Sequence, residues 1–194
     1  MSTSLYTFIF SAIMLLIISE GAAKKQREER HLQSTPAKKN ENHHFHQLCR
    51  KEHNKDRIIH HAPALKTNST LYIRARRWAS YLSKRDDTSD VPHEMISGVG
   101  ENIYWMTHAK RPYSQYAEMA VQYWYDENKK YDYAAGRYSP DTAHFTQMVW
   151  ISTTQVGCGY NVSSSTTIFV VCKYYPQGNI PGEYQSNVLP PGKY

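Results

Sequence analysis

Two short apolar blocks in the last third of the chain limit its possible folds most strongly. The first reads Thr-Ala-His-Phe-Thr-Gln-Met-Val-Trp at 142–150, and the second reads Phe-Val-Val-Cys-Lys-Tyr-Tyr-Pro-Gln-Gly-Asn at 169–179. We expect each block to form a strand, with His144 opening the first and Cys172 inside the second. The Pro-Gln-Gly-Asn turn then ends the second strand.

The three cysteines of the chain indicate one disulfide. Cys158 lies in a Val-Gly-Cys-Gly run between the two blocks and is followed by a polar turn and Cys172. In an oxidising compartment these two thiols would close a short loop, stabilising the fold by about 3 kcal/mol. Cys49 is then the odd cysteine, either buried or free for intermolecular pairing.

The amino-terminal segment predicts secretion. Residues 5–18 form an unbroken weakly polar to apolar run that is followed by small residues, so we expect a signal peptide over residues 1–23. An uncleaved anchor is the alternative, although the run is shorter than the ~20 residues of a membrane span. Glycosylation sequons at Asn68 and Asn161 also favour a secreted, extracellular protein with no stable membrane span in its mature form.

The positive charge of the chain does not by itself indicate a nucleic-acid partner. The formal net charge is +6, and much of it lies in a polar stretch that follows the predicted signal. We interpret residues 24–42 as a basic polar linker, disordered in solution, and residues 43–194 as one folded domain.

Apolar periodicity within this domain predicts an α+β fold. We expect a helix at about 44–60, a second helix capped by Thr70, a short strand at 98–105 and a third helix at 113–128. The two apolar blocks add strands, so helices would flank a small antiparallel sheet.

The two blocks resemble the two signatures of the CAP superfamily, which comprises cysteine-rich secretory proteins, antigen 5 and pathogenesis-related group 1 and is built on the SCP domain. The resemblance covers roughly residues 43–189 and implies an α-β-α sandwich. The carboxyl-terminal Asn-Val-Leu-Pro-Pro-Gly-Lys is similar to the tail of the Golgi-associated plant pathogenesis-related members.

The resemblance also implies a cavity lined by two histidines and two glutamates. His93 precedes a Gly-Glu-Asn motif that contains Glu101, Glu127 follows a Trp-Tyr pair, and His144 opens the first block. Ala143 stands where the family usually has glycine.

Such residues are suited to binding a divalent metal. Neutral imidazoles of His93 and His144 would be ligands for Zn²⁺ or Mg²⁺, with Glu101 and Glu127 completing the shell or holding waters. One alternative is a metal-assisted or Ser/His/Glu-type protease, which would also need a nucleophile and an oxyanion donor. Another is a buried polar network that only joins loop, helix and strand. No Gly-x-Ser-x-Gly or His-Glu-x-x-His motif is present, so we expect binding rather than catalysis.

Three tyrosines suggest a second ligand. Tyr131, Tyr133 and Tyr138 match the loose aromatic pattern that marks a sterol-binding loop in some CAP proteins, and a tyrosine offers an apolar face and a polar tip. A plain packed loop is the alternative. We therefore expect a secreted CAP protein, monomeric or weakly dimeric, that binds a divalent metal and either a sterol or other lipid or an extracellular protein receptor.

Overall fold

The computed structural model of the protein describes residues 36–192. The predicted signal peptide and the linker before residue 36 lie outside this range. The chain divides into two compact units, Met1–Asn40 and Glu41–Tyr194, and the second contains the sheet and the candidate site. Within the described residues, no helix combines the length and the apolar character that crossing a membrane requires.

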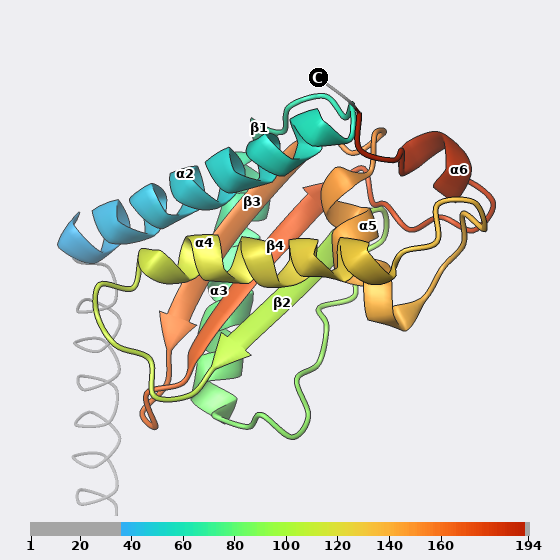
Figure 1. The fold of residues 1–194 in the computed structure, drawn as a ribbon. Helices are drawn as coiled ribbons and strands as arrows, with labels where there is room; N and C mark the ends of the chain where they lie inside the picture. Colours follow the sequence, from blue (N-terminus) through green and yellow to red (C-terminus); the bar gives the residue numbers. More distant parts are fainter. Residues whose placement is uncertain (1–35, 193–194) are drawn as a thin grey trace, which may run out of the picture. The chain divides into compact units, whose positions relative to one another are not determined.

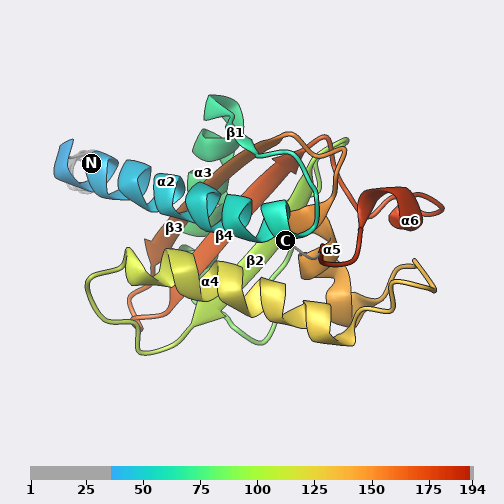
Figure 2. The ribbon, with the colours of Figure 1, turned by 45° about the horizontal axis from the view of Figure 1, so that its top comes forward.

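The second unit is built in three layers (Figure 1). Figures 1 and 2 show α2 and α4 across one face of the sheet and α3 on the other. The predicted α-β-α sandwich is therefore confirmed. In chain order the elements are α2 (Pro36–Ile59), β1 (Lys66–Thr67), α3 (Ser69–Arg85), β2 (Gly100–Met106), α4 (Gln115–Tyr125), the 3-10 helices η1 (Asp126–Lys130) and η2 (Pro140–Thr142), α5 (Ala143–Val149), β3 (Gln155–Val162), β4 (Ile168–Tyr175) and α6 (Tyr184–Asn187).

The sheet has the strand order β1-β3-β4-β2. Both β2 and β3 run antiparallel to β4, as predicted, but β1 pairs with β3 in parallel, so the sheet is mixed. Because β2 is an outer strand, one of its long edges has no neighbouring strand in the sheet.

Two predicted helix starts differ from the structure. The first helix, expected from residue 44, begins at Pro36 and includes residues that we assigned to the linker. The side chain of Asn42 is buried and accepts a hydrogen bond from the Tyr160 amide at 3.4 Å, so the packed domain starts before residue 43. Helix α3 is capped by Asn68 rather than Thr70, because the Asn68 side chain accepts from the amides of residues 70 and 71.

The segment that carries His144 is a helix, so the prediction of a strand there was wrong. Residues 145–150 are all buried, and a short run without polar alternation does not distinguish a strand from a helix. Ala143 has φ −67° and ψ −31°, an ordinary helical backbone in which glycine has no advantage. Helix α4 is also shorter than expected and continues as η1 from Asp126.

A buried arginine holds the carboxyl end of α5. The guanidinium of Arg57 donates to the carbonyl oxygens of Met148 at 2.8 Å and Trp150 at 2.9 Å. It also donates to those of Pro63 and Thr153, both at 2.8 Å. Burial lowers the pKa of Arg57 to about 10, so the group stays charged at neutral pH. One side chain of α2 therefore supplies a hydrogen bond to the last turn of α5 and another to the residue that follows it.

The Val-Gly-Cys-Gly run brings α3 and the sheet into close contact. A Cβ atom at Gly157 would lie 2.0 Å from the Tyr72 nitrogen, and one at Gly159 would lie 2.5 Å from Arg76 Cγ. Both glycines face α3, while Cys158 between them faces the opposite side of the sheet, where α2 packs. The absence of side chains at these two positions sets the distance between the layers.

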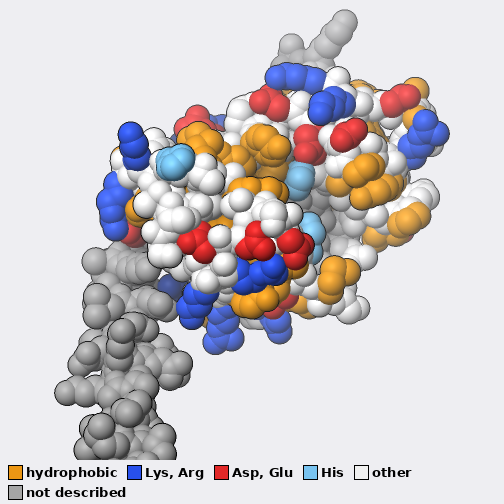
Figure 3. Space-filling model, turned by 90° about the horizontal axis from the view of Figure 1, so that it is seen from below, with side chains coloured by type: hydrophobic (Ala, Val, Ile, Leu, Met, Phe, Trp, Pro, Cys, Tyr) orange, Lys and Arg blue, Asp and Glu red, His pale blue; other side chains and the backbone are white. Residues whose placement is uncertain are grey.

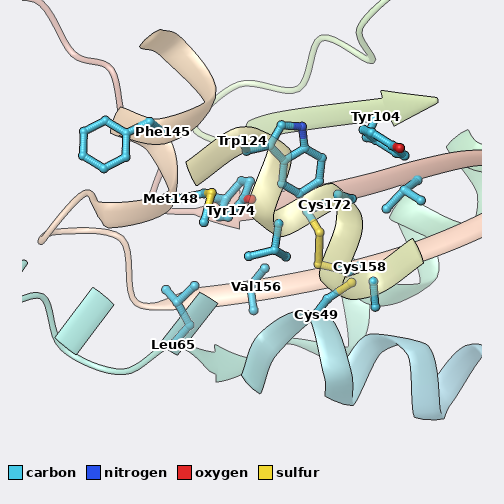
Figure 4. Packing of buried hydrophobic residues seen from close by; sticks show 14 of the residues in the cluster. Cys49, Leu65, Tyr104, Trp124, Phe145, Met148, Val156, Cys158, Cys172 and Tyr174 are labelled. Atoms are coloured by element: carbon cyan, nitrogen blue, oxygen red, sulfur yellow. A yellow bond between two sulfur atoms is a disulfide. The ribbon is translucent and has the colours of Figure 1, made fainter. Parts of the chain in front are cut away.

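The predicted disulfide is present. Cys158 and Cys172 lie directly opposite each other on β3 and β4, with their Cα atoms 4.1 Å apart, and are bonded. Cys49 of α2 is a buried free thiol, and its sulfur lies within 4.8 Å of both disulfide sulfurs (Figure 4). Burial raises the pKa of the Cys49 thiol well above its usual range. Of the two alternatives for Cys49, the buried one is confirmed.

A buried hydrogen-bond network links α2 to the other side of the core. His53 donates from Nδ1 to the Cys49 carbonyl and accepts at Nε2 from the Tyr174 hydroxyl, both at 2.7 Å. The Tyr174 oxygen in turn accepts from the Asn102 amide at 3.2 Å. These roles require a neutral imidazole, and burial lowers the pKa of His53 to about 4.

We predict that mild acid destabilises the fold through its buried histidines. Burial lowers the pKa of both His46 and His53 from 6.5 to about 4, so the unfolded chain takes up their protons first as the pH falls. The contribution of the two histidines is complete above pH 6.5 and should drop by about 1–3 kcal/mol between pH 6.5 and 5. Asp56 acts in the opposite direction, because burial raises its pKa to about 7, so the difference in slope between wild type and a histidine variant isolates the histidine contribution. Urea unfolding at a series of pH values measures this slope. A His53→Gln variant should show a shallower slope, and an identical slope would contradict the assignment.

A second prediction concerns the contact between α3 and β3. Gly157→Ala places a methyl group against the α3 backbone, so we expect a loss of about 1–3 kcal/mol in unfolding free energy from overpacking. Thermal unfolding measures it. Gly182→Ala is the comparison for backbone strain without steric contact, because its Cβ would have open space but its φ is +85°. Equal stability of Gly157→Ala and the wild type would show that the layers adjust freely.

Candidate functional site

The first histidine–glutamate pair lies where β2 begins. His93 belongs to the loop before β2, and its Nδ1 lies 2.7 Å from Oε1 of Glu101. The same oxygen accepts the backbone N–H of Glu94 at 3.0 Å. The Glu101 side chain is nearly buried, whereas that of His93 is half exposed. Glu101 is therefore fixed in the protein and orients an imidazole that solvent can reach.

A buried lysine holds Glu101 in position. Lys173 is opposite Glu101 in the β2–β4 register, and its Nζ lies 2.5 Å from Glu101 Oε2 and 2.7 Å from Glu94 Oε2. Its side chain is fully buried and lies 6.0 Å from the centre of the Trp78 ring. A buried ammonium group requires such counter-charges, so the lysine and the two carboxylates stabilise one another.

The second pair joins η1 to α5. Glu127 Oε1 lies 2.6 Å from His144 Nδ1, and its Oε2 accepts the backbone amides of His144 at 3.0 Å and Phe145 at 3.1 Å. Glu127 thus caps the amino end of α5 and orients the imidazole at the same time. The ring of His144 also stacks on Trp124, with ring centres 6.2 Å apart.

Both pairs present the imidazole in the same way. A carboxylate can only accept, so Nδ1 of each histidine carries a proton, and in the neutral imidazole Nε2 is the nitrogen with the free lone pair. Within residues 36–192, no hydrogen bond occupies Nε2 of His93 or His144. Figure 3, which views the molecule of Figure 1 from below, shows histidine and acidic side chains beside a hollow in the surface. A pocket of about 360 Å³ is lined by His144, Tyr123 and residues 103–106.

One residue connects the two pairs. Asn102 follows Glu101 in β2, and its amide donates to the backbone oxygen of His144 at 3.1 Å. The four side chains do not form a closed ligand shell, because no three of them bring donor atoms within 4.8 Å of one another in the described residues. The structure therefore shows two oriented pairs, linked through the backbone, with exposed imidazoles.

Comparison with known proteins decides the family. The model of the cysteine-rich secretory protein family, CAP, matches residues 50–174. The chain belongs to this family. It is 33% identical over 151 residues to "Golgi-associated plant pathogenesis-related protein 1" of Homo sapiens, covering 77% of this chain and 95% of the relative. It is also 33% identical to a probable pathogenesis-related protein of Candida albicans, and the match covers 75% of this chain and 67% of that relative.

Solved structures support the same CAP fold. "Crystal structure of NaASP2 with Zn2+" matches with a TM-score of 0.59 at 21% identity, covering 77% of this chain and 87% of that one. "Crystal Structure of Na-ASP-1" matches with a TM-score of 0.60 at 22% identity over 77% of this chain, which spans only 42% of that structure. At these identities the comparison establishes the fold alone.

The three candidate lipid-binding tyrosines of this CAP domain do not lie in one environment. Tyr131 is buried and Tyr133 is partly buried; their rings pack at 4.9 Å from each other, and both contact Phe145 of α5. Tyr133 also stacks on His60. Tyr138 is 58% exposed. Two of the three thus contribute to the packing around α5, and sterol binding stays a prediction.

Both sequon asparagines already have structural partners. Besides capping α3, Asn68 donates from Nδ2 to Gln155 Oε1 at 2.5 Å. Asn161 at the end of β3 donates from Nδ2 to Ser83 Oγ at 2.8 Å. Because a glycan attaches to this same nitrogen, each modification would replace a donor hydrogen. Glycosylation stays a prediction.

Two groups that support the site have no signal in the sequence. Arg57 and His53 lie in α2, where a charged residue and a histidine are ordinary on a solvent-exposed face, yet both are fully buried. Besides one nearby carbonyl each, Arg57 binds carbonyl oxygens 91 to 96 residues away and His53 binds a hydroxyl 121 residues away. Only the partners across the core reveal their roles.

We predict that the Glu127 cap stabilises α5 measurably. Glu127→Ala removes the acceptor of two helix amides, so we expect a loss of about 1–2 kcal/mol in unfolding free energy, measured by urea denaturation. Glu118→Ala is the matched control, because Glu118 is exposed on α4 and makes no hydrogen bond within the described residues. Equal stability of the two variants would contradict a capping role.

Proposed function

We propose that this CAP protein is secreted and acts by binding a ligand rather than by catalysis. We further propose that it holds a divalent cation through Nε2 of His93 and Nε2 of His144. The observation that supports this most directly is the shared orientation of the two imidazoles. Each donates its Nδ1 proton to a glutamate and leaves Nε2 unoccupied in the described residues. Histidines that ligate metals are commonly held by a carboxylate in this way.

The donor set favours Zn²⁺ over Mg²⁺. Imidazole nitrogen is a common ligand of zinc, whereas magnesium prefers oxygen ligands and retains several waters. With two protein ligands, water or a bound partner would supply the remaining positions, which agrees with the lack of a closed shell in the described residues. A solved structure of similar fold is that of NaASP2 with Zn²⁺, which supports the same choice here.

The extracellular setting has separate support. A buried disulfide is typical of proteins that fold in an oxidising compartment. The matched family is that of cysteine-rich secretory proteins. The predicted signal peptide falls outside the described residues and agrees with the same compartment.

The protease alternative gains less from the geometry. A nucleophilic mechanism needs a hydroxyl or thiol next to its base, and within residues 36–192 neither His93 nor His144 is hydrogen-bonded to one. A polar network alone would not require both Nε2 atoms to remain without partners. Metal binding accounts for more of the observed arrangement than either alternative.

We predict that Zn²⁺ binding depends on both histidines. Isothermal titration calorimetry of the purified protein should give one site per chain, and His93→Ala or His144→Ala should weaken it at least tenfold, because each removes one of two protein ligands. Glu101→Gln and Glu127→Gln should weaken it less, since they disturb only the orientation of a ligand.

The control for this titration is His44→Ala, which removes an exposed histidine of α2. Its Zn²⁺ affinity should equal that of the wild type. Unchanged affinity in the His93→Ala, His144→Ala double variant would overturn the proposal, provided that circular dichroism shows an intact fold.

A further inference from the structure

A groove follows the outer side of β2 and is separate from the two histidine–glutamate pairs over most of its length. It consists of the pocket beside His144 and an adjoining pocket of about 540 Å³ on α4, and we call it the edge groove. Tyr104 and Tyr123 line both pockets, and their rings meet edge to face at 5.5 Å. The two pockets therefore adjoin at this tyrosine pair.

The lining of the edge groove combines apolar surface with an acidic rim. Tyr123 is 59% exposed, Trp105 42% and Met119 39%, all high values for such large apolar side chains. The exposed face of α4 adds Gln115, Glu118 and Gln122, and Asp126 follows at the start of η1. Aromatic walls with a few polar groups are typical of a binding groove.

The edge groove also contains free backbone groups of a strand. Trp124 donates from its indole N–H to the Ile103 carbonyl at 3.2 Å, so the Ile103 backbone points away from β4. In an antiparallel strand, alternate residues direct their N–H and C=O groups to the same side. The N–H and C=O of Trp105 therefore point outward as well, where β2 has no neighbouring strand in the sheet.

The charge of the rim indicates the sign of the occupant. Glu118 makes no hydrogen bond within the described residues, and Asp126 accepts from Lys129 at 2.7 Å. Lys129 is largely exposed, so solvent weakens this ion pair. Lys55, which is paired with Glu52, also interacts electrostatically with Glu118. An acidic rim on a chain of formal net charge +6 is complementary to a basic partner.

We propose that the edge groove binds an extended, basic peptide segment of another protein. The segment adds to the outer edge of β2 by backbone hydrogen bonds at Trp105, places an apolar side chain against the Tyr104–Tyr123 pair and directs a lysine or arginine toward Glu118. Strand addition of this kind takes its affinity from the backbone and its specificity from alternate side chains. The proposal does not depend on the metal site.

The test uses a fluorescein-labelled acetyl-Lys-Thr-Val-Thr-Lys-Thr-amide peptide, in which the lysines and the valine lie on the same face of an extended chain, with binding followed by fluorescence anisotropy. Glu118→Lys should weaken binding by about three- to fivefold and strengthen binding of the counterpart with glutamate in place of lysine. Tyr123→Ala should also weaken it. Glu183→Lys makes the same charge change outside the groove and should leave the affinity unchanged.

Backbone pairing is tested with two N-methylated forms of the same peptide. In a paired strand, every second amide faces the neighbouring strand. Methylation of the amides that face β2 removes their hydrogen-bond donors and should weaken binding at least tenfold. Methylation of the amides that face away from β2 should be tolerated. Equal affinities of the two forms, or no effect of Glu118→Lys, would overturn the proposal. A concentration-dependent dimer in sedimentation experiments that is absent in the Tyr123→Ala variant would also overturn the proposal, because the groove would then bind a second copy of this chain.

Addition of EDTA separates this proposal from the metal site. Peptide binding should persist in EDTA, whether or not the Zn²⁺ titration succeeds. Loss of peptide binding in EDTA would overturn strand addition as an independent interaction and assign the peptide contact to the metal.

Discussion

The guanidinium of Arg57 is the interaction on which the site depends most. It is fully buried and donates to four carbonyl oxygens, two of which belong to the end of α5 and the residue that follows it. A helix of seven residues has too few internal hydrogen bonds to be stable alone. With Arg57 at one end and Glu127 at the other, its position is set by the rest of the domain, and so is that of His144.

The glutamates of the site each have two uses. Glu127 caps a helix with one oxygen and orients an imidazole with the other, and Glu101 is held by a buried lysine while it orients His93. A mutation of either residue therefore changes stability and ligand geometry together. For this reason, loss of ligand binding in a glutamate variant can be interpreted only when the unfolding free energy of the same variant is also measured.

Local sequence patterns were sufficient for the fold class and the disulfide, because short motifs and apolar periodicity are local features. The residues of the two pairs came from the resemblance to the CAP motifs, since two histidines and two glutamates spread over about 50 residues form no pattern of their own. Local patterns failed at α5, since a completely buried run such as Phe145–Trp150 has no polar side to reveal its period. They also failed at His53, whose importance lies in a hydroxyl 121 residues away. Residues that act through contacts across the core leave no pattern in their own neighbourhood.

The position of Cys49 makes this thiol an internal reporter of motion. Its sulfur is enclosed between α2 and the strands that carry the disulfide, with no exposed surface. A thiol reagent can reach it only when the core opens around α2, and burial keeps it unreactive until then. The rate at which such a reagent modifies Cys49, in the protein with its disulfide intact, therefore measures how often the core around α2 opens. The same packing holds Arg57 and His53 in place.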